Sequence, residues 1–225
     1  GTSGTVQNLA IKANVGSQGG GGLAYSNAGT IAHCTVYGWD AKNVSNAINN
    51  ALGDKKEDSL AGADQYGGIV NTNTDSGKII DCCVLGPMDV GALGQTAGGI
   101  AYSNSGTIEN CYFLGKIYNS RSKNDLSSAM AIVAKNTGTV NNCYYLKYDD
   151  NTGVEGSSPL TAEQFESGEA TYLLNNGRTG AAAVWRQNLT GNDDGAETDR
   201  GPMLDSAHGC VYREGTKDNY TYYSL

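Results

Sequence analysis

Hydrophobic and polar positions recur along the first two thirds of the chain in a unit of about 20 residues. The copies read SGTVQNLAI (3–11), GGLAYSNAGTIAHCTVYG (21–38), GGIVNTNTDSGKIIDCCVLG (67–86), GGIAYSNSGTIENCYFLG (98–115) and MAIVAKNTGTVNNCYYL (130–146). Apolar and polar residues alternate within each copy, which predicts short strands. A Gly-Thr or Gly-Lys pair inside each copy predicts a turn between two strands.

Columns of similar residues emerge when the copies are aligned on the glycine of that turn. Two residues after it, at position +2, stand Val6, Ile31, Ile79, Ile108 and Val140, and at position +5 stand Leu9, Cys34, Cys82, Cys111 and Cys143. One copy cannot bury its apolar face alone, whereas stacked copies bury each column as a ladder. The odd step from +2 to +5 breaks strict alternation, so we expect a bend near +4. That bend position reads Asn8, His33, Asp81, Asn110 and Asn142.

A second polar column precedes the turn and consists of Asn27, Asn73, Asn104 and Asn136. Stacked amide side chains can hydrogen-bond from one copy to the next, as they do in cross-β stacks. Antiparallel neighbours would not align identical residues in this way, so the columns favour a parallel β-helix. Buried thiols acting as small apolar fillers explain the cysteine column better than disulfides, because parallel neighbours hold the Cβ atoms too far apart.

The paired glycines, the Y-S-N segment, the G-T-[IV] turn and the N-C pair together resemble the GLUG repeat of bacterial surface proteins. That repeat also occurs in the non-catalytic parts of some IgA-cleaving metallopeptidases. The resemblance covers residues 3–148 and implies a right-handed parallel β-helix on a secreted or cell-surface bacterial protein. In the last copy Met130 and Ala131 replace the paired glycines, which suggests that the stack ends there.

These patterns predict a mainly all-β fold in two parts. Residues 1–148 are expected to form a β-helix of about five coils, with insertions at 39–66, 87–97 and 116–129. Within the first insertion, NVSNAINNAL (43–52) has apolar residues at helical spacing, with Ser45 as a cap. Residues 149–225 are expected to form a small α/β cap with short helices and strands, which protects the open end of the stack.

Within this C-terminal part, Thr161 and Gln164 can form a capping box at the start of a helix. Because the chain opens inside a repeat, we expect it to be flanked by other domains of a longer protein.

Composition and charge narrow the functional classes. The chain has 32 Gly and 14 Tyr but only 17% charged residues, which fits a β-rich extracellular protein with many tight turns. The net charge of −8 argues against nucleic acid as a partner, since phosphate contacts need clustered Lys and Arg. No apolar run reaches the length of a membrane span, so membrane insertion is not expected.

Patterns for catalysis and metal binding are weak. The sequence contains no CxxC, HExxH or GxSxG motif. Glu109 is predicted to point outward, but its column supplies no second carboxylate for glycoside chemistry. The densest acidic stretch contains Asp193, Asp194, Glu197 and Asp199, which could hold calcium, although a solvated acidic turn is the simpler interpretation. We therefore expect no enzyme activity and no cofactor, with calcium as the single candidate ion.

Aromatic residues are the remaining candidates for ligand contact, and they are Tyr25, Tyr102, Tyr112, Tyr144 and Trp39. Outward rows of tyrosine suit sugar stacking or protein contact. Plain strand propensity explains them equally well.

The sequence thus predicts a non-catalytic, adhesin-like module that binds a host glycan or an extracellular protein through its insertions. One alternative is a structural spacer or stalk in a larger multidomain protein such as a peptidase. The other is a carbohydrate-active β-helix enzyme, for which the sequence offers no carboxylates in register.

Overall fold

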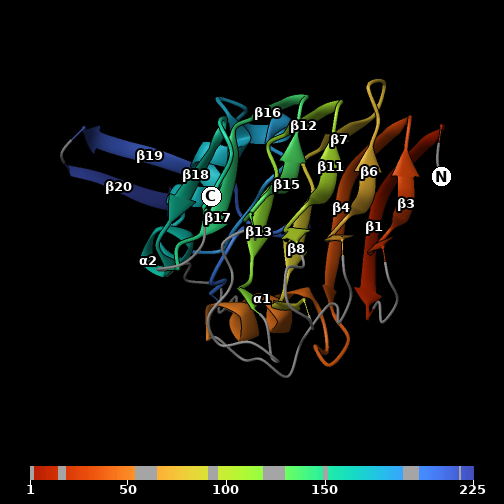
Figure 1. Ribbon diagram of the computed structural model, residues 1–225. Coiled ribbons are helices and arrows are strands. Elements are labelled where there is room, and N and C mark those ends of the chain that lie inside the picture. The colour runs from red at the N-terminus through yellow and green to blue at the C-terminus, as the bar shows by residue number, and fades with distance from the viewer. Residues whose placement is uncertain are drawn as a thin grey trace.

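The structure is a computed structural model that describes residues 3–14, 19–53, 65–90, 96–118, 130–148, 152–189, 198–217 and 219–225. Its main feature is one large parallel sheet (Figure 1). In order, this sheet contains β16 (Thr139–Asn141), β12 (Thr107–Glu109), β7 (Lys78–Ile80), β4 (Thr30–Gly38), β8 (Cys83–Leu85), β13 (Tyr112–Leu114), β17 (Cys143–Leu146) and β18 (Ser157–Leu160). In addition, β1 (Thr5–Ala13) pairs with β4.

Three smaller parallel sheets surround the rest of the main apolar core. The first contains β15 (Val133–Asn136), β11 (Ala101–Asn104), β6 (Val70–Asn73) and β3 (Ala24–Asn27). The second contains β10 (Ala97–Gly98), β5 (Tyr66–Gly67) and β2 (Gly20–Gly21), and the third contains β14 (Ile117–Tyr118) and β9 (Met88–Asp89).

The remaining elements are few. Among the described residues, the α-helices are α1 (Val44–Leu52), α2 (Ala162–Glu166) and α3 (Glu169–Asn175), and a 3-10 turn spans Gly180–Ala182. An antiparallel hairpin of β19 (Val211–Thr216) and β20 (Asn219–Ser224) ends the chain.

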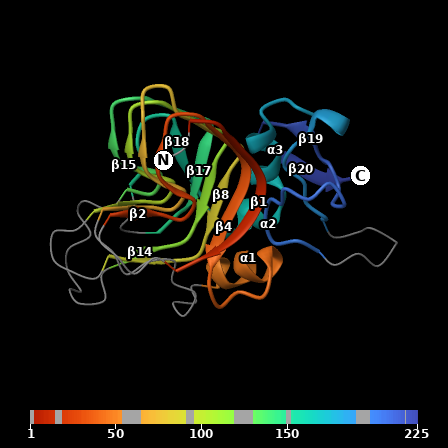
Figure 2. The same cartoon turned by 90° about the vertical axis from the view of Figure 1, so that its right-hand side faces the viewer.

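The predicted fold class, a right-handed parallel β-helix with a small α/β cap, is wrong. That prediction placed a bend in every copy and stacked the copies as the coils of a solenoid. In the structure β4 continues as one strand through His33 and pairs with β1, β7 and β8, so the strands before and after the bend position belong to a single sheet. The result is a nearly closed, barrel-like sheet that curves around the core, with eight parallel strands in its main order and β1 as a ninth (Figure 2).

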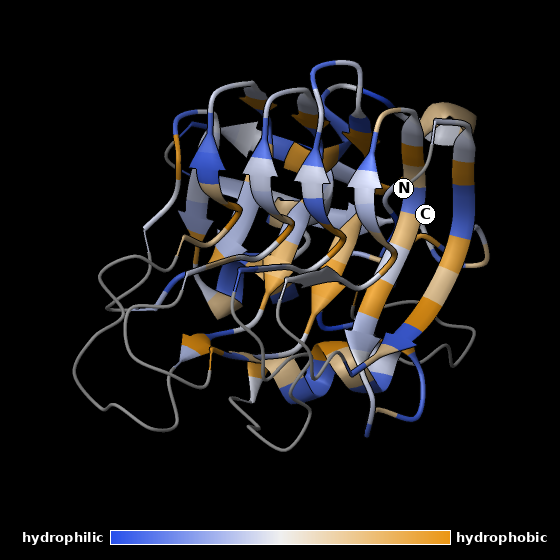
Figure 3. Ribbon diagram, turned by 45° about the vertical axis from the view of Figure 1, so that its right-hand side comes forward, coloured by the Kyte–Doolittle hydropathy of each residue, from blue (hydrophilic) through white to orange (hydrophobic). Residues whose placement is uncertain are grey.

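Within the large sheet the repeat copies pair in parallel, position against position. Val6 pairs with Ile31 and Ile31 with Ile79, and the same column continues through Ile108 to Val140. These side chains point into the main core and are buried there, except that Val6, at one end of the column, is only partly buried. Figure 3 shows apolar and polar residues alternating along the long strands of the sheet.

The bend predicted from the odd spacing is confirmed as a local change of backbone conformation. The +4 residue of every copy has a positive φ, with values of 58° for Asn8, 52° for His33, 51° for Asp81, 52° for Asn110 and 50° for Asn142. This left-handed conformation costs most residues about 1–2 kcal/mol, and Asn and Asp tolerate it best. Because of it the residue at +5 points inward, where strict alternation would have pointed it outward.

A second apolar core covers the outer face of the large sheet. The sheet contributes Cys83, Leu85, Tyr112, Leu114 and Leu146, and the cover consists mainly of Ala47, Ile48, Ala51, Phe165, Leu174, Trp185 and Met203. Residues on both sides of position 148 therefore share one core. The C-terminal part lies against a face of the sheet, in addition to extending its edge with β18.

The helix termini follow local hydrogen bonding. Helix α1 falls within the predicted range 43–52, but Asn43 caps it instead of Ser45, because the Asn43 side chain accepts a hydrogen bond from the backbone N–H of Asn46 at 2.8 Å. The capping box of Thr161 and Gln164 at the start of α2 is confirmed. Each of these caps satisfies backbone donors that a helix leaves unpaired in its first turn.

Candidate binding surfaces

The points where the predicted insertions leave and re-enter the strands lie beside one another. Asp89 pairs with Tyr118 at the start of the second and third insertions, and Tyr66 pairs with Ala97 where the first and second insertions end. Met130, where the third ends, forms a bridge with Gly98. We call Tyr66, Asp89, Ala97, Tyr118 and Met130 the insertion rim. The inner parts of the insertions, 54–64, 91–95 and 119–129, lie outside the described residues.

Part of the first insertion belongs to the framework. Ala47, Ile48 and Ala51 of α1 are buried in the second core. The Tyr148 hydroxyl donates to the carbonyl oxygen of Ala51 at 3.4 Å. An experiment that removes the whole of 39–66 would therefore damage the core, whereas 54–64 can be exchanged with α1 kept.

The candidate aromatic residues have very different environments. Tyr25 is 62% exposed and Trp39 is 59% exposed, so both can meet a ligand. Trp39 also lines an open hollow of about 450 Å³, together with Lys12, Ala13, Asn14 and Gly22. Tyr144 is half-buried, and its hydroxyl donates to the side-chain oxygen of Asn142 at 2.7 Å.

Two of the candidate tyrosines are buried, contrary to the expectation of outward, accessible rings. Tyr102 is only 7% exposed, and the Lys135 ammonium lies 4.9 Å from its ring centroid. Tyr112 is fully buried because the C-terminal segment covers the outer face of β13, and its hydroxyl donates to the carbonyl oxygen of Pro202 at 2.6 Å. Its ring packs edge-on against Trp185, with the centroids 5.0 Å apart.

The asparagine column forms a continuous chain of hydrogen bonds. Asn27 donates to Asn73 at 2.8 Å, Asn73 to Asn104 at 2.7 Å, and Asn104 to Asn136 at 2.8 Å, always from Nδ2 to Oδ1. Asn27, Asn73 and Asn104 are fully buried, so these bonds replace the hydrogen bonds to water that the amides lose on burial. The column holds successive repeat copies together, and its three fully buried amides are not accessible to a ligand.

The cysteine column is also structural. Cys34, Cys82, Cys111 and Cys143 are free thiols, and each donates to the carbonyl oxygen two residues before it, at 3.1–3.3 Å. The backbone N–H groups of Cys34 and Cys82 in turn donate to the sulfur of the next copy at 3.4 Å. Burial, and hydrogen bonding to Cys143 and Cys82, raise the pKa of Cys111, which keeps that thiol protonated.

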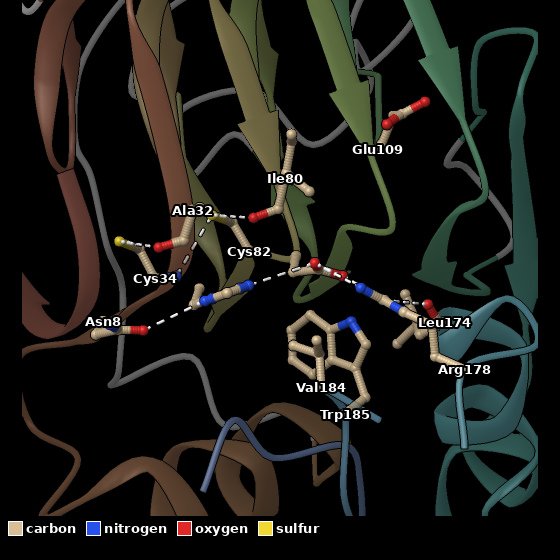
Figure 4. Close-up of polar contacts among 12 residues, drawn as sticks. Asn8, Ala32, Cys34, Ile80, Cys82, Glu109, Leu174, Arg178, Val184 and Trp185 are labelled. Atoms are coloured by element: carbon tan, nitrogen blue, oxygen red, sulfur yellow. Dashed lines mark hydrogen bonds and ion pairs between the residues drawn. The ribbon is translucent and has the colours of Figure 1, made fainter. Parts of the chain in front are cut away.

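A polar row follows the bend positions along the outer surface of the sheet (Figure 4). The His33 ring contacts the Asn8 side-chain oxygen at 3.3 Å through Nδ1 and the Asp81 carboxylate at 3.5 Å through Nε2. Arg178 donates two hydrogen bonds to the carboxylate of Asp81, at 2.6 and 2.8 Å. The Asp81 side chain is 3% exposed, so this bidentate pair compensates a buried charge.

A cavity of about 280 Å³ adjoins this row. Its lining consists of Asn8, Leu9, Ala10, His33, Thr35, Val44, Met203, Leu204 and Asp205. Sequence reasoning found the bend positions but missed Arg178 and this cavity. No local signal marks either of them, because Arg178 reaches its partner across 97 residues of sequence.

The calcium candidates are only partly within the described residues. Asp193, Asp194 and Glu197 lie outside them. Asp199 is buried, and its carboxylate accepts a hydrogen bond from the backbone N–H of Asn188 and contacts His208 Nδ1, both at 2.6 Å. Across the described parts of the chain, no three His, Cys, Asp or Glu side chains come together as a metal site.

Among the described helices, none combines the length and apolar character needed to cross a membrane. No protein-family model matches the chain, and no curated protein or solved structure shows significant similarity to it.

Proposed function

We propose that the protein is a non-catalytic binding module of a bacterial surface or secreted protein, which recognises a host glycan or an extracellular protein through its insertions. The single observation that carries the proposal is the insertion rim. Strand pairing brings Asp89 beside Tyr118 and Ala97 beside Tyr66, so the second insertion begins next to the third and ends next to the first. Binding residues are often found on loops that a rigid scaffold positions in this way.

The framework is suited to this role because it holds the rim residues in register. The asparagine chain and the cysteine column link successive copies through buried hydrogen bonds. The bidentate pair of Asp81 and Arg178 fixes the C-terminal part to the same sheet. The asparagine chain, the cysteine column and the pair of Asp81 and Arg178 thus all stabilise the framework.

Binding of the purified protein to an array of glycans and host-matrix proteins, with and without calcium, tests the proposal. Residues 54–64 are exchanged for a Gly-Ser segment of equal length with α1 retained, and 91–95 and 119–129 are exchanged in the same way. We expect a saturable interaction that at least one exchange weakens about tenfold or more. The matched control is the same exchange at 149–151, which lie outside the insertions and should leave binding unchanged.

A structural spacer remains the second candidate, and the continuous asparagine chain favours it, since such a chain stiffens the stack. The two functions predict different results in the binding experiment on the array. A spacer shows no saturable interaction on the array, or one that all three exchanges leave intact. Either result would refute binding through the insertions.

A further inference from the structure

The β19–β20 hairpin stands away from the large sheet and is rich in tyrosine (Figure 1). Arg213 pairs with Tyr222 and Gly215 with Tyr220 across the two strands. Since residues opposite one another point to the same side of an antiparallel pair, Arg213, Tyr220 and Tyr222 share one face of the hairpin. Tyr172 of α3 lies against this face, with its ring centroid 5.9 Å from that of Tyr222.

Arg213 is held between two aromatic rings. Its guanidinium carbon lies 4.4 Å from the ring centroid of Tyr172 and 4.0 Å from that of Tyr220. Cation–π contacts of this kind fix the plane of the guanidinium and leave its N–H groups directed sideways. The Arg213 side chain is exposed, so those donors can meet a ligand.

This cation has no carboxylate partner within ion-pair distance among the described residues. Arg178 and Arg200, by contrast, form ion pairs with Asp81 and Glu166. Glu214, the neighbour of Arg213, belongs to the other face of the hairpin by strand alternation. Burial, together with the charge of Glu169 in α3, raises the pKa of Tyr222.

We propose that Tyr172, Arg213, Tyr220 and Tyr222, the tyrosine–arginine cluster, bind a carbohydrate that carries a carboxylate. The C–H face of a pyranose ring packs on aromatic rings, and phenol hydroxyls can hydrogen-bond to sugar hydroxyls. A planar guanidinium binds a carboxylate through two parallel hydrogen bonds. A sugar acid offers both features in one ring unit, as uronic and sialic acids do.

The proposal goes beyond binding through the insertions, because the cluster uses none of the rim residues. A surface with an overall charge of −8 repels acidic glycans in general. An oriented cation with no carboxylate partner in the described part of the chain is therefore the feature that would permit one such ligand to bind at a single place.

Isothermal titration calorimetry with matched pairs of sugars tests the proposal. One pair is a galacturonic acid trisaccharide and its methyl ester, and the other is sialyllactose and lactose. We expect one acid to bind at least about tenfold more tightly than its neutral counterpart, because charge-assisted hydrogen bonds carry the difference. The pair in which the acid binds shows whether the ligand is a uronate or a sialate.

Variants of the hairpin locate the site. Arg213→Gln should weaken binding of the acidic sugar about tenfold or more, and Arg213→Lys should weaken it several-fold, because lysine keeps the charge but loses the planar fork. Lys217→Gln is the matched control, since it removes one positive charge from the same hairpin outside the cluster, and it should leave affinity within about twofold. Tyr220→Leu should weaken both members of a pair by removing a ring.

Several outcomes would overturn the proposal. They are failure of both acids to bind, equal affinity for acid and neutral sugar, and losses as large in Lys217→Gln as in Arg213→Gln. Thermal unfolding of each variant verifies that the hairpin change leaves the fold intact. Exchange of residues 54–64 should not alter binding of the acidic sugar. Failure of the proposal for the tyrosine–arginine cluster is therefore distinguishable from failure of binding through the insertions.

Discussion

At the scale of single residues, the +4 position decides where side chains point. A left-handed residue there lets both +2 and +5 face the main core, and the spacing of apolar residues was sufficient to predict this bend. Some partners of the +4 side chains lie in the same column, as where Asn142 donates to Asn110. Other partners were not predictable, because Arg178, which binds Asp81, and Leu173, whose carbonyl oxygen accepts from Asn142, lie outside the repeat copies.

Replacement of Asn110 separates backbone strain from the lost side-chain bond. Asn110→Ala removes the acceptor for Asn142 and places at φ near 52° a residue without the polar side chain that lets Asn adopt this conformation, so we expect a loss of about 2–3 kcal/mol in the free energy of unfolding. Asn110→Gly removes the same bond but tolerates the backbone, and should cost about 1 kcal/mol less. Urea denaturation compares the two variants. Equal losses would contradict the role given to the left-handed backbone.

At the scale of elements, one segment can serve two cores. Cys82, immediately before β8, is buried in the main core, and Cys83 inside β8 is buried in the second core. The strands, the parallel register and the helix at 43–52 could be predicted because they depend on local periodicity. Burial of Tyr112 could not, since its cover comes from Pro202 and Trp185, far along the chain. The unbroken course of β4 was also not predictable, because its copy has the same spacing of apolar residues as the copies in which the strand divides into two.

Alkaline conditions should weaken the second core through Cys83. Burial raises the pKa of Cys83 from 9.0 to about 12. The unfolded chain loses this proton first, so the thiol's contribution to stability is complete below pH 9 and is lost as the pH rises towards 12. We expect the free energy of unfolding, measured by urea denaturation, to fall between pH 8 and pH 10, by up to about 1.4 kcal/mol per pH unit for one thiol. Cys83→Ala should show a shallower decline over this interval, and identical pH profiles would refute the assignment.

At the scale of the whole molecule, the large sheet separates two cores, and the second is built from both predicted parts of the chain. Tyr112, Leu114 and Leu146 supply one side of it, and Phe165, Leu174 and Trp185 supply much of the other. A boundary at 148 could be inferred from the end of the repeat pattern. The sequence contained no periodic signal that the following residues return to cover a face of the repeat strands.

Heating should therefore unfold the described framework in one transition. Calorimetry of the full chain is expected to show a single peak, since both parts share the second core. A fragment that ends at residue 148 exposes Leu85, Tyr112 and Leu114, and should bind the dye ANS and aggregate. Trp185→Ala in the full chain should cost about 3–5 kcal/mol. Two separate peaks, or a soluble fragment that does not bind ANS, would show that the parts are independent.

The asparagine chain has a direction, and this has a consequence for how the repeat copies behave together. The Nδ2 atoms of Asn27, Asn73 and Asn104 each donate to the Oδ1 of the next asparagine in the same direction. Asn73, Asn104 and Asn136 donate to the backbone carbonyls of Gly77, Gly106 and Gly138. A single amide cannot flip alone, because its reversal would set oxygen against oxygen on one side and N–H against N–H on the other. The four amides thus behave as aligned dipoles whose orientation is all-or-none, which gives the molecule a built-in polarity from one end of the stack to the other.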